Sequence, residues 1–432
     1  MAPPSTTARP SAATSNRAMA ASGARKGWRS SSKPRPSSSD GGRAAMMASR
    51  PQAFMALYLA TLLLQVAAGL LNSWVALRSL ALGTGDFLIG SLMAVNALGL
   101  VLGALSGYWL IARIGHVRAY ALACALAVAV TLAHDFSTWL PFWLLLRFIV
   151  GLALMSLYMV LESWINEQVE PASRGKVLAW YMTASFLGLI GGQLGLGLGG
   201  GASRALLDLV AIAFALCLVP VAFTRRPLPQ AVAPRASLQP LHFVRRVPQA
   251  LLAIVVTGLL SGAFHGLAPV YASQQGMDAA MVGLFMASCL AAGLLAQFPL
   301  GLLSDRFARP RLIRLFALLL AVACLPLLWT PVPLALLLVC GFVIGLMQFS
   351  LYPLALALAN ERVESQERVS LAGLFLVGFG LGSSIGPLLA GAAMEVFGGR
   401  ALYGFSALCG LVLALLVRER LAGRQPVAAG EG

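Results

Sequence analysis

The chain has 432 residues, of which 59% are hydrophobic and only 11% are charged, and its formal net charge is +16. Because a soluble domain carries about 25% charged residues, this composition excludes a protein that faces water on all sides. The positive charge does not indicate a nucleic-acid partner, since the basic residues lie between apolar runs and in a tail and form no stripe with interleaved aromatic residues.

The first 50 residues differ in composition from the rest of the chain. Residues 1–50 are rich in Ser, Pro, Ala and Arg and contain a single acid, Asp40. Such a segment cannot bury a core, so we expect a disordered, basic tail. An organellar transit peptide has a similar composition, and a translation start at Met46 or Met47 explains the segment equally well.

From Gln52 on, apolar runs alternate with short polar joints. Most of the runs reach the roughly 20 residues that cross the bilayer core, so the pattern predicts twelve transmembrane helices. All six cysteines lie inside these runs without CxxC or metal-ligand spacing, so we expect no metal and no cofactor. The predicted spans are 52–77, 87–111, 117–134, 139–163, 173–198, 205–223, 248–271, 279–303, 311–329, 332–358, 367–394 and 400–417.

The distribution of basic residues predicts the orientation and the division into halves. Arg and Lys concentrate in the even-numbered joints and in the C-terminal tail, so the positive-inside rule places both termini in the cytoplasm. The longest joint, residues 224–249, contains five Arg and no acid and follows the sixth span. We predict that it is a cytoplasmic linker between six-helix bundles at 51–223 and 250–418, with a cytoplasmic tail at 419–432.

One stretch of the chain occurs twice. Residues 151–174 align without a gap to residues 345–368, and the two copies agree at 10 of 24 positions. Composition alone gives about 2 matches over this length. A period of 194 residues is too long for a solenoid and indicates two parallel halves of a membrane protein.

The joint after the eighth span carries a specific motif. It reads Gly301-Leu-Leu-Ser-Asp305-Arg306-Phe-Ala-Arg309, which resembles the G-x-x-x-D-R-x-G-R signature of the major facilitator superfamily. The resemblance implies a cytoplasmic gate, in which a small residue lets two helices approach and the charged pair meets a neighbouring helix end and an acid. The acids that the repeat supplies there are Glu361 and Glu364.

The first half carries a degraded copy of this motif. Ala112 stands where the superfamily has Asp, while Arg113 remains to meet Glu167 or Glu170. A loop that is merely basic is the alternative for this copy. The whole predicted gate consists of Arg113, Glu167, Glu170, Gly301, Asp305, Arg306, Glu361 and Glu364.

The fourth span contains charges inside the expected membrane. Arg147-Phe-Ile-Val-Gly151 resembles the R-x-x-x-G of the superfamily, whose proton-coupled members use that Arg within the membrane. Arg147, Tyr158 and Glu162 lie on one helical face. A charge at this depth is costly and marks a functional site by default, so we predict Arg147 and Glu162 as coupling residues. Glu162 as an interfacial acid is the alternative.

Polar side chains on other spans predict a central cavity. The resemblance implies that spans 1, 4, 7 and 10 line it, and each of these spans carries polar residues within its apolar run. As an alternative, each of these residues taken singly forms an interhelical hydrogen bond. For His265 two roles are open, a neutral hydrogen-bonding group and a site that binds a proton. The predicted cavity residues are Gln65, Asn72, Arg147, Tyr158, His265, Gln348 and Tyr352.

The glycines of spans 5 and 11 predict close helix packing. They also resemble the Gly-rich antiporter motif of the superfamily, but that motif places a Gly-Pro pair in span 5. Here span 5 has Gly192-Gln193, and the pair Gly386-Pro387 lies in span 11. The prediction of an antiporter therefore rests on a displaced motif.

The combination of SLYMVLESWINEQV, QFPLGLLSDR and SLYPLALALANERV resembles the bacterial YcaD-like branch of the superfamily, from Met55 to Val417. The implied fold is all-α, with twelve transmembrane helices in two pseudo-repeated six-helix bundles. The implied protein is a monomeric, multi-pass protein of the inner membrane that moves a small solute by alternating access.

The chain has no G-x-x-x-x-G-K-[ST] motif, so we expect an ion gradient, of protons, as the driving force. A sparsely charged cavity favours export of a lipophilic or weakly polar solute. Uptake of a metabolite and a non-transporting sensor remain as alternatives. An enzyme would need clustered catalytic groups in the spans, and these hold almost none, so we expect no enzyme.

Overall fold

Helices alone form the regular structure of the described chain in this computed structural model, which describes residues 54–417 except 170–171, 223–239, 330–331 and 365. The predicted tails at 1–50 and 419–432 lie outside these residues. All described residues belong to one compact unit, Met46–Gly432. The elements are α2 (Met55–Ala81), α3 (Asp86–Ile114), α4 (His116–Ala133), α5 (Leu140–Gln168), α6 (Arg174–Leu194), η2 (Gly195–Leu198), α7 (Arg204–Leu216), α8 (Leu218–Ala222), α9 (Pro240–Arg246), α10 (Pro248–Gln274), α11 (Ala279–Arg306), α12 (Arg309–Cys324), η3 (Leu325–Leu328), α13 (Leu334–Asn360), α14 (Arg368–Phe397) and α15 (Ala401–Leu416).

The helices have the length and polarity of membrane spans. Within the described residues, eleven helical segments are long and apolar enough to cross a bilayer, and α15 is apolar but shorter. A helix is the natural element for such a run, because its backbone groups are satisfied within the segment and need no water. The all-α membrane fold predicted from the sequence is confirmed.

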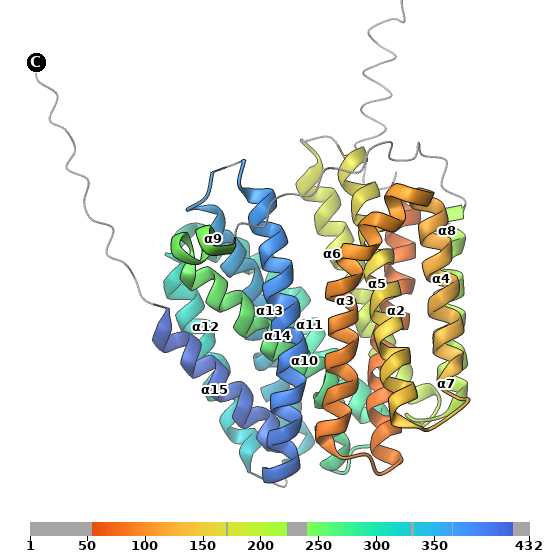
Figure 1. The fold of residues 1–432 in the computed structure, drawn as a ribbon. Helices are drawn as coiled ribbons and strands as arrows, with labels where there is room; N and C mark the ends of the chain where they lie inside the picture. Colours follow the sequence, from red (N-terminus) through yellow and green to blue (C-terminus); the bar gives the residue numbers. More distant parts are fainter. Residues whose placement is uncertain (1–53, 170–171, 223–239, 330–331, 365, 418–432) are drawn as a thin grey trace, which may run out of the picture. The chain divides into compact units, whose positions relative to one another are not determined.

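The first half (α2–α8) and the second half (α10–α15) form the two bundles of the fold (Figure 1). By the repeat, α3 corresponds to α11 and α6 corresponds to α14. The halves meet through matching pairs of these helices, α3 with α14 and α11 with α6. The linker predicted at 224–249 remains a prediction, because residues 223–239 lie outside those described, and α9 lies within its range.

The two ends of the bundles differ in charge. One end, here called the basic end, contains the joints near Gly115, Ser173, Phe307 and Glu361. The opposite end contains the joints near Gly83, Phe136, Gly200, Gly276 and Gly398. At the basic end Gly115 separates α3 from α4 with a φ of 82°, a left-handed conformation that favours glycine.

Glycines hold the helices of each half close together. A Cβ built on Gly188 or Gly192 of α6 would lie 2.4 or 2.5 Å from a carbonyl oxygen of α2, at Leu62 or Val66. In α14, Gly386 would meet the carbonyl oxygen of Leu259 on α10 at 2.1 Å, in the corresponding pair of helices. The predicted packing role of these glycines is confirmed.

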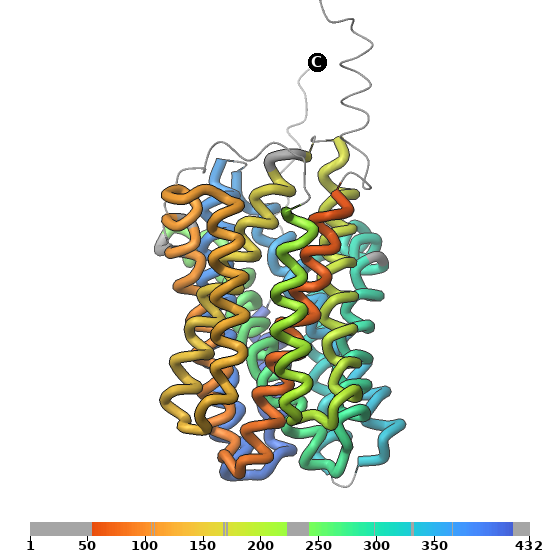
Figure 2. The backbone as a smooth tube through the Cα atoms, turned by 90° about the vertical axis from the view of Figure 1, so that its right-hand side faces the viewer, coloured from red at the N-terminus to blue at the C-terminus, as the bar shows by residue number. Residues whose placement is uncertain are grey.

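The residue after Gly192 adds hydrogen bonds to this contact. Gln193 is buried, its Nε2 donates to the carbonyl of Gly69 over 3.0 Å, and its Oε1 accepts from Ser73 over 2.7 Å. Gln193 therefore fixes α6 against α2. Figure 2 shows α2 also running beside α7, with which it is in contact.

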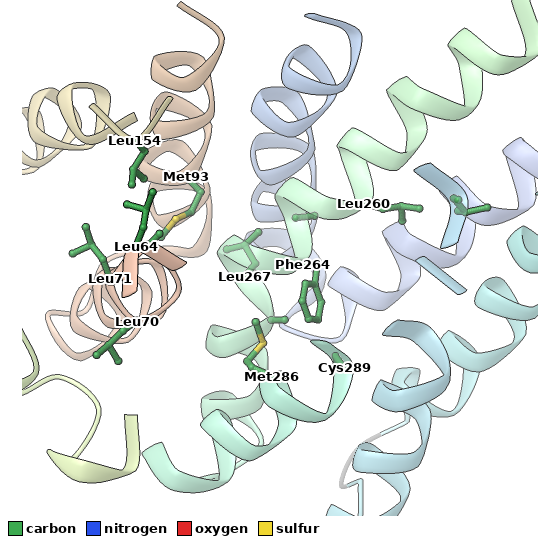
Figure 3. Close-up of a cluster of buried hydrophobic side chains, with 14 of the residues drawn as sticks. Leu64, Leu70, Leu71, Met93, Leu154, Leu260, Phe264, Leu267, Met286 and Cys289 are labelled. Carbon is green, nitrogen blue, oxygen red and sulfur yellow. The ribbon is translucent and has the colours of Figure 1, made fainter. Parts of the chain in front are cut away.

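Apolar side chains fill the interior of both halves and also cover their outer faces. Leu145, Leu295 and Val396 are large and exposed, as expected of surfaces that face lipid. Figure 3 shows part of the buried set, drawn from helices of both halves. Its labelled members are Leu64, Leu70, Leu71, Met93, Leu154, Leu260, Phe264, Leu267, Met286 and Cys289.

Candidate functional site

Arg147 on α5 is a fully buried charge at the centre of the first half. Its Nη2 donates a hydrogen bond to Oδ1 of Asn72 on α2 and lies 3.4 Å from the sulfur of Met93 on α3. Its Nε and Nη1 have no hydrogen-bond partner among the described residues, and no described carboxylate forms an ion pair with it. A buried charge without compensation costs several kcal/mol, so this arrangement favours the binding of an anionic or strongly accepting group.

A cavity of about 150 Å³ lies next to this arginine and between the halves. Asn72 and Met93, which contact Arg147, form part of its wall. Two polar atoms in the wall, Oδ1 of Asn96 and Oγ of Ser383, are buried without a described hydrogen-bond partner. A wall of this kind offers hydrogen bonds to a bound solute. The lining is Asn72, Met93, Asn96, Ala97 and Leu100 from the first half and Ser261, Gly262, His265, Gly266, Phe379 and Ser383 from the second.

His265 is the titratable residue in this wall. Its Nδ1 lies 2.8 Å from the carbonyl oxygen of Ser261, and a carbonyl only accepts, so Nδ1 carries the hydrogen of the neutral ring. Nε2 is then left as an acceptor. The ring also contacts Phe264 and Phe349 edge-on, at centroid distances of 5.2 and 6.0 Å. His265 therefore has a fixed orientation and one free acceptor.

The other predicted cavity residues do not line this cavity. Tyr158 donates to Oε1 of Gln65 over 2.8 Å and so joins α5 to α2. The ring of Tyr352 packs edge-on against Phe379 at 5.4 Å, and Phe379 lines the cavity. Gln348 is buried, and its Nε2 has no described partner. The structure thus places Asn72, Arg147 and His265 at the cavity, and Tyr352 contacts Phe379 in its wall.

Glu162 lies apart from Arg147 on α5. Fifteen residues separate them, or about 22 Å along a helix axis, so the two predicted coupling residues are not in contact. The Glu162 side chain is exposed, and Tyr181 on α6 donates a hydrogen bond to it over 3.3 Å. These residues therefore belong to two separate polar sites on one helix face.

The gate residues at the basic end form contacts within the second half. Glu361 pairs with Arg309, the last residue of the motif, whereas the resemblance had assigned it to Arg306. Arg309 also donates to the carbonyl of Ala357 over 3.1 Å and to Ser304 over 3.2 Å. Arg309 can reach this helix end because it begins α12. In the sequence, the role of Arg309 was indicated by its position as the last residue of the motif.

A second cluster at the basic end went unnoticed in the sequence. Arg246 on α9 donates to Glu367 over 2.8 Å and lies 4.0 Å from Glu364. His242, also on α9, lies 3.0 Å from Glu367. Pairing across more than 100 residues leaves no local pattern, so sequence reasoning missed this cluster.

Among the described gate residues, Arg113, Asp305 and Arg306 form no salt bridge with the other half. A Cβ built on Gly301 would have no described atom within 4 Å, so the close helix approach expected there is absent in this structure. Gly301 and Asp305 instead line a cavity of about 670 Å³ between α6 and α11. Arg113 stacks over the ring of Trp109 at 5.1 Å. Glu170 and the side chain of Glu167 lie outside the described residues.

At the opposite end, polar contacts join the two halves. Nε2 of Gln274 on α10 donates to both carboxylate oxygens of Asp86 on α3, over 3.0 and 3.2 Å. The backbone N–H of Phe87 donates to Glu395 on α14 over 3.2 Å. Close to these bonds, a Cβ on Gly90 would lie 2.2 Å from the carbonyl oxygen of Pro387. The halves are therefore closed against each other at this end.

The chain is similar to known membrane transporters in both sequence and fold. A sequence profile of the Major Facilitator Superfamily matches residues 57–333 and 250–431. The uncharacterized MFS-type transporters YcaD of Salmonella enteritidis and Salmonella typhimurium are each 30% identical to it over 375 residues, which cover 86% of this chain and 96% of theirs.

Solved structures share the fold at low sequence identity. The nucleoside transporter NupG aligns with a TM-score of 0.69 at 15% identity, covering 84% of this chain and 97% of that one. A D-xylose-proton symporter aligns with a TM-score of 0.66 at 17% identity, covering 84% and 96%. From its profile match, its relatives and its helix arrangement, the chain belongs to the major facilitator superfamily and is a YcaD-like transporter of that family.

Proposed function

We propose that this protein is a proton-coupled secondary transporter that exports a lipophilic or weakly polar solute from the cell. The observation that carries the proposal is the cavity between the halves, whose wall contains polar atoms without partners among the described residues and lies against the buried charge of Arg147. A site shared by two bundles is what alternating access requires, because rocking of the bundles opens it to one side and then to the other.

The orientation of the protein follows from its charges. The basic end lies in the cytoplasm, with both termini, and the opposite end faces the outside of the inner membrane. The contacts of Asp86 with Gln274 and of Gly90 with Pro387 then close the outer side. The open space at Gly301 and Asp305 is consistent with an inward-facing state, in which the cytoplasmic gate is apart. In the outward-facing state this gate closes, and Asp305 and Arg306 contribute to it.

Arg147 serves as the coupling residue. Its Nε and Nη1, which have no partner among the described residues, hold a buried anion or relay charge during the transport cycle. Glu162 and His265 are the titratable groups that can exchange protons on the same path, and the protein works as a monomer.

The experiment that tests the proposal uses purified protein in proteoliposomes. Candidate solutes come from a growth screen that compares a deletion strain with an overexpressing strain against toxic compounds and nutrients. With a hit in hand, a pH gradient should drive its transport by the wild type. Arg147→Ala should lose gradient-driven transport at least tenfold, because the charge is removed, while exchange of solute down its own gradient is affected less.

The conservative variant Arg147→Lys tests whether a positive charge alone is enough for coupling, since it keeps a cation but loses the planar guanidinium group. If Arg147→Ala retains full gradient-driven transport, Arg147 has no coupling role. If no compound alters growth and no solute moves in liposomes, the transport proposal itself fails and the sensor alternative gains support.

A further inference from the structure

Two buried thiols lie in contact between α4 and the point where α7 gives way to α8. Sγ of Cys124 on α4 and Sγ of Cys217 are 3.4 Å apart, and both side chains are buried. Both cysteines are free in this structure. The sulfurs of a disulfide are about 2.05 Å apart, so these two atoms need to approach by only about 1.4 Å to form one.

The local fold of the sixth span holds Cys217 against α4. α7 ends at Leu216 and α8 begins at Leu218, so Cys217 alone separates the two helices. Pro220 accounts for the break, because a proline ring inside a helix clashes with the carbonyl group four residues earlier. At this break the hydroxyl of Tyr120 on α4 donates to the carbonyl of Cys217 over 3.3 Å. Tyr120 precedes Cys124 by one helical turn, so two adjoining turns of α4 fix the position of Cys217.

The hydrogen bonds of the two thiols differ. Sγ of Cys217 lies 2.9 Å from the carbonyl oxygen of Phe214, and a carbonyl only accepts, so Cys217 donates its hydrogen there. The hydrogen between the two sulfurs therefore belongs to Cys124, and Cys217 accepts it. A hydrogen bond donated to a sulfur stabilises the negative charge that this sulfur carries when it reacts as a nucleophile. The geometry thus favours Cys217 as the first sulfur to react and Cys124 as the second.

The depth of the pair restricts the reagents that reach it. Cys124 lies near the middle of α4, which is a candidate membrane span, so the pair is far from both aqueous surfaces. A charged reagent is excluded there, because a charge is costly in the hydrocarbon region. A small uncharged oxidant such as hydrogen peroxide is not excluded on this ground. A disulfide formed at this depth is also shielded from the charged thiols that reduce cytosolic proteins.

We propose that Cys124 and Cys217 form a site of oxidative modification, at which a small hydroperoxide converts the two thiols to a disulfide. Sγ of Cys217 loses its proton and attacks one oxygen of hydrogen peroxide. An S–O bond forms as the O–O bond breaks, and the leaving hydroxide takes the proton and departs as water. Sγ of Cys124 then attacks the sulfur of Cys217, an S–S bond forms as the S–O bond breaks, and a second water leaves. The thiols lose two electrons, and the peroxide is reduced to two waters.

The disulfide would join segments that are 93 residues apart but belong to the same half. A bond that closes a loop of this length stabilises the folded state. The helices that α4 contacts most are α3, α5, α7 and α8, all of the first half. Oxidation therefore stiffens this half and leaves the two halves free to move against each other, so the modification is independent of the transported solute.

The test uses the purified full chain in detergent, treated with hydrogen peroxide. Remaining thiols are blocked with iodoacetamide, and the protein is digested with trypsin. Mass spectrometry should find residues 119–147 joined to residues 205–225, two tryptic peptides with one cysteine each, and dithiothreitol should separate them. Of the six thiols, two should be lost first. The midpoint of thermal unfolding should rise by about 2 °C or more, and dithiothreitol should reverse the rise.

Single variants assign the two roles. Cys124→Ala should leave Cys217 as an oxidised sulfur that carries one or more oxygen atoms, because no second thiol can displace the oxygen. In Cys217→Ala the thiol of Cys124 should be oxidised at least tenfold more slowly than Cys217 is in Cys124→Ala. Cys289→Ala, at a buried cysteine on α11, is the matched control and should form the disulfide as the wild type does.

Two outcomes overturn the proposal. The first is that peroxide leaves both thiols of the wild type intact, and the second is that a different pair of cysteines is joined first. Equal oxidation rates of the remaining thiol in Cys124→Ala and Cys217→Ala would overturn the order of reaction. Gel filtration shows whether the variants are folded, and the peptide map of the wild type decides the proposal even if they are not. None of these results bears on the proposed transport function.

Discussion

The side chain of Arg147 on α5 donates a hydrogen bond to the side-chain carbonyl of Asn72 on α2, and Asn72 lines the cavity between the halves. Asn72 thus supplies a neutral acceptor where a counter-charge would be expected. A neutral acceptor leaves the positive charge available to a ligand, while a carboxylate in its place would neutralise the charge permanently.

The first prediction follows from this pair. Asn72→Asp should raise the midpoint of thermal unfolding, because the buried charge gains an ion pair, and should reduce gradient-driven transport at least tenfold. Asn72→Ala should instead destabilise the protein by about 1.5–3 kcal/mol, the range for hydrogen bonds to charged groups. Thermal unfolding and proteoliposome transport measure the two effects. If Asn72→Asp transports as well as the wild type does, transport does not require that the charge of Arg147 be free of a counter-ion.

The second prediction concerns closure at the opposite end. A Cβ on Gly90 would lie 2.2 Å from the carbonyl oxygen of Pro387, so Gly90→Val should prevent α3 and α14 from closing. We expect at least a tenfold loss of transport and faster labelling of Ala97→Cys, a residue of the cavity wall, by an impermeant maleimide added outside. The labelling uses a background in which the six native cysteines are replaced by Ser.

Gly378 on α14 gives the matched control for this closure. A Cβ there would contact Ile254 and Val255 at an ordinary 3.6 Å, so Gly378→Ala should leave transport and labelling unchanged, and Gly90→Ala should fall between the wild type and Gly90→Val. Equal labelling of Ala97→Cys with and without Gly90→Val would mean that this contact does not control outside access.

The third prediction concerns stability. Gln193 bonds to Ser73 and to the carbonyl of Gly69, in the close contact of α6 with α2. A double-mutant cycle of Ser73→Ala and Gln193→Leu should give a coupling energy of about 0.6 kcal/mol, the average for such bonds between membrane helices, for which the maximum is about 1.7 kcal/mol. Unfolding in a denaturing detergent measures it, and a value near zero would show that glycine packing alone fixes this contact.

Much of the fold was predictable, because a helix that crosses the bilayer must be apolar over about 20 residues. Apolar length predicted the spans, and the repeat predicted the halves, since each copy ends its long helix with the same polar residues. α15 is the weakest case, because 16 helical residues are short for a span. The packing role of the glycines in α6 and α14 was also predictable, since a helix face of small residues lets a neighbouring helix approach closely.

The site was only partly predictable. Arg147 stood out because a lone charge in a span is rare, but its acceptor Asn72 was only one of several polar residues on span 1. Pairings between distant segments left no signal at all. Gln274 and Asp86 are 188 residues apart, and nothing local indicates that they meet. The choice of Arg309 over Arg306 as the partner of Glu361 depends on where α12 begins.

The membrane class, the duplicated architecture and the family could all be inferred from the sequence, because hydropathy, basic joints and motifs are properties of short stretches of chain. The folded chain was needed to show which polar residues share a cavity and which end of the bundles is closed. The two charges of α5 are separate in the structure, with Arg147 against the central cavity and Glu162 bonded to Tyr181. Contacts between helices depend on how the helices are rotated and tilted, and the apolar runs that predict a helix specify neither.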